Sequence, residues 1–203
     1  MAAVSRSSVH AVAGLGCRVK TGRAIAVALA GPSAAPSILF RREIQLCDPK
    51  VPESRQPYHG AIMPFVPAKP AAVVRGKKAA QRVALAAVRN LAEELRAAGR
   101  KLAGVGLVVS SNPDLNRIGS SHVRAHALEG ILFREILQAA ARACRLPSVL
   151  ILEREALERA AKGLRRSPQD LQRTLARFGK EIGSHWRAEE KSAALAAWLA
   201  LKM

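Results

Sequence analysis

A strand, a long helix and a second strand follow one another between residues 102 and 152, and this order limits the possible folds most strongly. Leu102 to Val109 is a continuous apolar run, typical of a strand buried on both faces. Apolar residues then recur at helical spacing from Ser121 to Cys144, and a shorter apolar run, Ser148 to Leu152, comes after Pro147. Two strands joined in this way by one helix lie parallel through a right-handed crossover. The sequence therefore predicts an α/β fold.

Two further apolar runs precede this unit and predict a hairpin. Arg23 to Ala30 and Ser37 to Leu46 are separated by a turn that contains glycine and proline. An antiparallel hairpin beside parallel strands makes the predicted sheet mixed. A long amphipathic helix, residues 71–98, lies between the hairpin and the next strand and ends at Gly99.

The remaining segments divide the chain into an arm, one domain and a helical extension. Residues 1–22 carry no acidic residue and no long apolar run, so we expect a flexible N-terminal arm. Six prolines between residues 48 and 70 exclude a regular central strand there, apart from a short edge strand near Gly60 to Val66. The predicted domain covers residues 23–160, and residues 161–203 form a helical extension packed on it. Three short helices are predicted at the end of the chain, at about 153–163, 168–179 and 186–201.

The order of these elements resembles the ribonuclease H-like fold, in which an antiparallel meander precedes alternating helices and strands. The resemblance covers about residues 23–160 and includes the junction-resolving nucleases of the RuvC type; the expected branch is a bacterial one. Nucleases of this fold hold two divalent metal ions with carboxylates at the strand ends, so the resemblance implies an aspartate in the first strand. No acidic residue precedes Glu43 in this sequence. With Ala24 to Ala30 taken as the first strand, a standard two-metal nuclease site is not expected.

The charge of the chain indicates a polyanionic partner. Thirty-three lysine and arginine residues against 15 aspartate and glutamate residues give a formal net charge of +18. Such an excess attracts nucleic acid, DNA or RNA, before other partners. The densest basic cluster opens the 71–98 helix and can bind phosphates through side chains and free N–H groups; it consists of Arg75, Lys77, Lys78 and Arg82. A solvated helix start is the alternative for this cluster, and compositional drift is the alternative for the net charge.

Two histidines and a glutamate predict a metal site on the 121–144 helix. His122, His126 and Glu129 fall within about 60° of one another around the helix axis, because successive residues are about 100° apart. Imidazole and carboxylate ligands suit zinc or manganese, and the nuclease resemblance adds magnesium as a third divalent candidate. The helix follows a strand, so its first turns face the crevice at the carboxyl ends of the strands.

Neighbouring residues extend this candidate site. Asp114 comes just after a predicted strand, and we assign Asp114, Glu129 and His126 as candidate catalytic groups, with the carboxylates holding metal or acting as a base. His59, in the proline-rich segment, is a further candidate that can fold over the same crevice. The alternatives are acid–base or phosphate contact without a metal, and packing in which His126 and Glu129 pair across one helical turn.

The sequence lacks the motifs of several other classes of protein. The sequence has no glycine-rich nucleotide loop, so we expect no nucleotide cofactor, and it has no GxSxG elbow of a serine hydrolase. Three scattered cysteines predict neither a disulfide framework nor a zinc knuckle. No apolar run is long enough to cross a membrane, so we expect a cytoplasmic location and no membrane partner. Two functions remain: a phosphodiester-processing enzyme with an unusual histidine site, and a non-catalytic module that binds nucleic acid.

Overall fold

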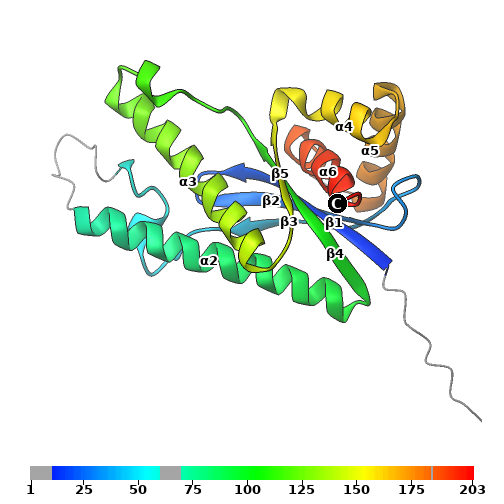
Figure 1. Ribbon diagram of the computed structural model, residues 1–203, viewed down its shortest axis with the longest axis horizontal. Coiled ribbons are helices and arrows are strands. Elements are labelled where there is room, and N and C mark those ends of the chain that lie inside the picture. The colour runs from blue at the N-terminus through cyan, green and yellow to red at the C-terminus, as the bar shows by residue number, and fades with distance from the viewer. Residues whose placement is uncertain (1–10, 60–69, 184) are drawn as a thin grey trace, which may run out of the picture.

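A five-stranded mixed sheet forms the centre of the computed structural model, which describes residues 11–59, 70–183 and 185–203 (Figure 1). The strands are β1 (Ala11–Lys20), β2 (Arg23–Ala30), β3 (Ser37–Gln45), β4 (Arg100–Val109) and β5 (Ser148–Leu152). Their spatial order is β3-β2-β1-β4-β5. β2 is antiparallel to both β1 and β3, whereas β4 is parallel to both β1 and β5. The predicted hairpin, the parallel crossover and the mixed α/β sheet are confirmed.

Helices cover both faces of this sheet, as Figure 1 shows. On one face lie α2 (Pro70–Ala97) and α3 (Ser121–Ala143), and on the other lie α4 (Ala156–Leu164), α5 (Pro168–Ile182) and α6 (Ala188–Ala200). Three short 3₁₀ turns, η1 (Pro52–Ser54), η2 (Leu115–Arg117) and η3 (Glu153–Glu155), connect the larger elements. Side chains alternate between the two faces along each strand, so each helical layer has its own apolar cluster. No helix in the described residues is long and apolar enough to cross a membrane.

The first strand corrects the prediction of a flexible arm over residues 1–22. Residues 11–20 form β1, the central strand, which pairs with β2 and β4. Gly14 and Gly16 in this strand face α6. A Cβ atom on Gly16 would lie 1.9 Å from the carbonyl oxygen of Ala193, so α6 approaches β1 this closely only over glycine. The sheet therefore begins one strand earlier than residues 24–30, and residues 1–10 lie outside the described part of the chain.

The three C-terminal helices, α4, α5 and α6, form one of the two helical layers of the fold. α6 lies against β1, β2 and β4, and its Trp198 is completely buried. The indole Nε1–H of Trp198 donates a hydrogen bond to the carbonyl oxygen of Ser33 at 2.8 Å, which ties α6 to the β2–β3 turn. The short edge strand predicted near Gly60 to Val66 falls outside the described residues.

Candidate functional site

A crevice opens where the parallel strands end. The carboxyl ends of β1 and β4 lie at the same edge of the sheet, and a cavity of about 210 Å³ lies between them and α3. Its lining includes Arg18 and Lys20 from β1, Ser110 and Ser111 after β4, and His126 from α3. In open α/β sheets this edge is the usual place for a ligand. Both cationic side chains are paired with carboxylates, Arg18 with Glu153 and Lys20 with Glu189, so the crevice is lined by ion pairs and hydroxyl groups.

Arg18 connects the end of β1 to the turn after β5. Its Nε and Nη2 atoms donate hydrogen bonds to the two carboxylate oxygens of Glu153, at 2.8 and 2.6 Å, and its Nη1 donates to the carbonyl oxygen of Val19 at 2.7 Å. The Arg18 side chain is only 8% exposed. A bidentate pair of this kind fixes both groups. The carboxylate of Glu153 is therefore neutralised by Arg18.

Three histidines converge beside this crevice. His122 and His126 lie one turn apart on α3, which Ser120 caps by accepting a hydrogen bond from the N–H of Val123. The Nε2 atom of His126 lies 3.1 Å from Nε2 of His122 and 3.2 Å from Nε2 of His59, which arrives from the segment after η1. One ring nitrogen from each of the three histidines lies within 4.8 Å of the other two. The structure thus brings the candidate His59 together with both helix histidines.

The spacing of these nitrogens fits a transition-metal ion. Tetrahedral zinc with Zn–N bonds of about 2.0–2.1 Å separates its ligand atoms by about 3.3 Å. Partial burial lowers the pKa of His59 and of His126, and the charges of the neighbouring histidines lower them further. Both shifts favour neutral imidazole, which is the form that ligates a metal. Three imidazoles leave a fourth position for an oxygen atom, as in catalytic zinc sites.

Glu129 lies behind the histidines and not among the ligand atoms. Its buried Oε1 atom accepts hydrogen bonds from the backbone N–H groups of Tyr58 at 3.0 Å and His59 at 3.1 Å, and lies 3.4 Å from Nδ1 of His59. Burial raises the pKa of Glu129 to about 7, although the two N–H donors oppose that shift. This corrects the prediction of Glu129 as a metal ligand: the carboxylate positions the His59 ring so that Nε2 faces His126.

The fold of this chain is similar to that of solved structures. Thermus thermophilus RuvC in complex with a Holliday junction substrate matches 93% of this chain and 91% of its own, at 11% identity and a TM-score of 0.51. A second structure of Thermus thermophilus RuvC matches with 12% identity, 93% and 92% coverage and a TM-score of 0.49. The fold is ribonuclease H-like. The sequence matches no protein-family model, and a search of curated proteins found no relative.

The metal site of ribonuclease H-like nucleases does not fit the residues at the end of β1. Two metal ions bridged by carboxylates need acidic side chains there, but the charged residues of β1 are Arg18 and Lys20. The acidic residues that contact these two side chains are Glu153, whose two oxygens are both bonded to Arg18, and Glu189, which forms an ion pair with Lys20. Among the described residues, the group whose ligand atoms converge closely enough to hold a metal ion is instead that of the three histidines.

Asp114 is separate from the histidine cluster. The Oδ1 atom of Asp114 accepts a hydrogen bond from the N–H of Asn116 at 3.0 Å and caps the turn η2, and Asp114 is absent from the group of converging ligand atoms. This corrects the prediction of Asp114 beside the histidines, since a short polar residue after a strand is also the ordinary cap of a turn.

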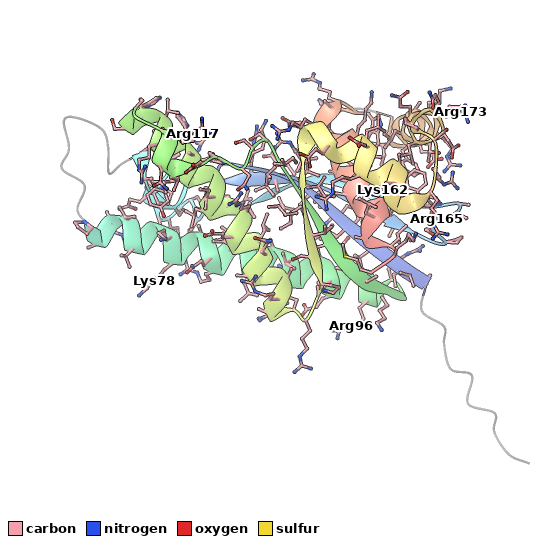
Figure 2. All side chains as sticks on the ribbon, turned by 45° about the horizontal axis from the view of Figure 1, so that its top comes forward. Lys78, Arg96, Arg117, Lys162, Arg165 and Arg173 are labelled. Carbon is pink, nitrogen blue, oxygen red and sulfur yellow. The ribbon has the colours of Figure 1, made fainter. Side chains whose placement is uncertain are left out.

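The predicted nucleic-acid cluster is partly neutralised. Arg75 forms an ion pair with Glu53, and Arg82 forms one with Asp48 at 2.5 Å, whereas Lys77 and Lys78 have no ion pair with any described acidic residue. Other basic side chains are spread over several faces of the molecule. Figure 2 labels six of them, Lys78 and Arg96 on α2, Arg117 before α3, Lys162 and Arg165 at the end of α4, and Arg173 on α5.

Proposed function

We propose that this protein binds nucleic acid at the carboxyl edge of its sheet and processes phosphodiester bonds there with a divalent metal held by His59, His122 and His126. The observation that carries the proposal is the convergence of three imidazole nitrogens beside a crevice lined by Arg18 and Lys20. The fold supports it, since the similar RuvC structure contains a Holliday junction substrate. The same proposal places the protein in the cytoplasm, where it has access to nucleic acid.

The chemistry of the ligands favours zinc or manganese. Imidazole suits these ions, whereas magnesium prefers oxygen ligands. When bound, such an ion polarises a phosphoryl oxygen and activates water at neutral pH. The chain supplies the remaining functions: Glu129 orients His59, and the hydroxyls of Ser110 and Ser111 position the phosphate.

A non-catalytic module that binds nucleic acid is the second candidate. The observation that favours it is the ion pair between Arg18 and Glu153, which replaces an acidic group at the end of β1 with a cation. The remaining basic surface can bind phosphates without any bond being cleaved. In this case the histidines stabilise the segment around His59, and no hydrolysis occurs.

One assay separates the two candidates. The full chain is incubated with labelled four-way junction, duplex DNA, single-stranded DNA and RNA, with and without Zn²⁺ or Mn²⁺, and products and complexes are resolved on gels. We expect metal-dependent cleavage that His126→Ala abolishes, with binding retained. His185→Ala is the matched control, because His185 is exposed and outside the cluster. Binding without cleavage under every metal condition would favour the module, and no binding at low salt would contradict both candidates.

A further inference from the structure

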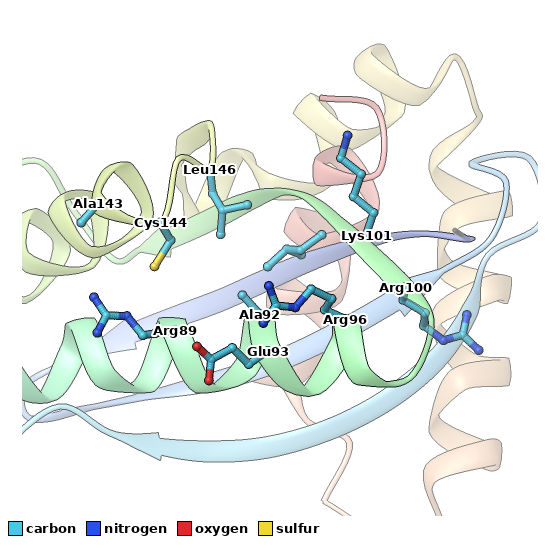
Figure 3. Close-up of a pocket in the computed structure, with 10 residues that line it drawn as sticks. Arg89, Ala92, Glu93, Arg96, Arg100, Lys101, Ala143, Cys144 and Leu146 are labelled. Atoms are coloured by element: carbon cyan, nitrogen blue, oxygen red, sulfur yellow. The ribbon is translucent and has the colours of Figure 1, made fainter. Parts of the chain in front are cut away.

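A second pocket lies at the opposite end of the parallel strands, where β4 begins. Its cavity of about 370 Å³ is open to solvent and is lined by the C-terminal half of α2, the beginning of β4 and the end of α3. Figure 3 shows Arg89, Ala92 and Arg96 on the α2 side, with Cys144 and Leu146 opposite them. The volume lies in the range of about 300–1,000 Å³ that small-molecule sites occupy. Since β4 begins here and ends at the histidine crevice, the two sites are separate.

The rim of this pocket is strongly cationic. Arg89, Arg96, Arg100 and Lys101 line it together with one acidic residue, Glu93. None of these four cations forms an ion pair or a side-chain hydrogen bond within the described part of the chain, although many other arginines do. Like charges that share one rim repel one another, and an anion between them removes that repulsion. Guanidinium groups bind phosphate in particular, because their planar forks match its oxygens.

The floor of the pocket is apolar. Leu102 is buried, while Ala92, Cys144 and Leu146 are half-buried and present their apolar surface to the cavity. A bare phosphate or sulfate would leave this floor uncovered. A ligand that covers it must combine an anionic group with a compact, weakly polar body, and the flat base and sugar of a nucleotide have this form. Guanidinium groups can also stack on the face of a base.

We propose that this pocket binds a nucleoside monophosphate unit, with the phosphate between Arg89 and Arg96 and the nucleoside over Ala92 and Leu102. The unit is a free mononucleotide or one unpaired nucleotide of a nucleic-acid chain, since both present the same chemistry. This second site does not depend on a metal at the histidine cluster.

The test measures binding of a fluorescent AMP analogue to the full chain by anisotropy. We expect Arg89→Gln with Arg96→Gln to weaken binding at least about 10-fold, since each lost charge-assisted contact is worth about that factor. Lys162→Gln with Lys180→Gln removes the same charge from α4 and α5, on the other face of the sheet, and should leave the affinity unchanged. Ala92→Phe fills the floor without changing any charge and should also abolish binding. Circular dichroism and thermal unfolding check that each variant is folded.

Competition experiments show whether binding requires the phosphate, and whether the ligand is a free nucleotide or a nucleic-acid chain. Adenosine should compete at least about 10-fold less well than AMP, because it lacks the anionic group. Stronger competition by a short single-stranded oligonucleotide assigns the pocket to a nucleic-acid chain, and equal or weaker competition assigns it to free nucleotide. The proposal is overturned if AMP does not bind at millimolar concentration, or if the Arg89 and Arg96 substitutions leave its affinity unchanged. His126→Ala should leave AMP binding intact, so failure of the histidine site and failure of this pocket remain distinguishable.

Discussion

Arg18 and Glu153 are 135 residues apart in the sequence, yet their side chains form a bidentate ion pair that joins the end of β1 to the turn after β5. The pair crosses over β4, which lies between these two strands. It therefore fixes the relative positions of the strand ends around the crevice.

Removal of Glu153 should destabilise the protein. Glu153→Ala leaves the buried guanidinium of Arg18 without its partner, and we expect a loss of about 3 kcal/mol in the free energy of unfolding. Glu155→Ala is the control, because the Glu155 side chain is 39% exposed and contacts Arg154 only at 3.7 Å, so its loss should be below about 0.5 kcal/mol. Urea unfolding followed by circular dichroism measures both. Equal effects of the two substitutions would show that the Arg18 pair does not stabilise the sheet edge.

Two glycine-to-alanine substitutions should have opposite effects on stability, one at the contact between β1 and α6 and one on α3. In Gly16→Ala the new Cβ would meet backbone atoms of Ala193, which cannot move without shifting α6, so we expect a loss of at least about 3 kcal/mol. A Cβ on Gly130 in α3 meets nothing within 4 Å, so Gly130→Ala should increase stability by up to about 1 kcal/mol through helix propensity. Melting temperatures of the two variants test this contrast. A stable Gly16→Ala variant would contradict the close approach of α6.

The same contact explains which part of the fold was not predictable from the sequence. The runs at 23–30, 102–109 and 148–152 are apolar enough to predict strands, and α2 and α3 have clear helical periodicity. β1 has glycine at positions 14 and 16, because a side chain there would collide with the α6 backbone. That tertiary contact determines its composition, and nothing local to residues 11–20 reveals the contact.

A second ion pair predicts how stability depends on pH. Burial alone would raise the pKa of Glu190, but hydrogen bonds from Arg41 and from the N–H of Arg187 outweigh it and hold this pKa below 4.5. A lowered pKa in the folded state stabilises the protein above the unfolded pKa, and this contribution disappears as the pH falls through the folded pKa. We expect Glu190→Gln to cost about 2 kcal/mol at pH 7, and progressively less below about pH 4. Urea unfolding at pH 7 and pH 3 measures the difference; a pH-independent cost would contradict the ion pair.

The cysteines should differ in reactivity. Burial raises the pKa of the Cys17 thiol to about 12, so the reactive thiolate is scarce at pH 8. Cys47 and Cys144 are only half-buried. We expect a disulfide reagent such as DTNB to modify two thiols in the native protein and three in denaturant. Rapid modification of Cys17 in the native state would show that β1 is not the buried central strand.

The candidate site was predictable only in part. The spacing of His122 and His126 places them on one helix face, and the structure brings their nitrogens together. His59 is 67 residues away from His126 in the sequence, and its place depends on a buried carboxylate that holds two backbone N–H groups. The role of Glu129 was missed because helical spacing gives a direction around the axis, but does not reveal which side the neighbouring segment covers.

Zinc titration of the full chain by isothermal calorimetry tests the central claim, a metal ion held by three histidines, most directly. We expect one Zn²⁺ per chain, with binding lost in His126→Ala and weakened about 10- to 100-fold in Glu129→Gln, since Glu129 orients a ligand without touching the metal. His185→Ala should bind zinc like the unmodified protein. Absence of zinc binding, or equal affinity in the unmodified protein and in His126→Ala, would contradict the account.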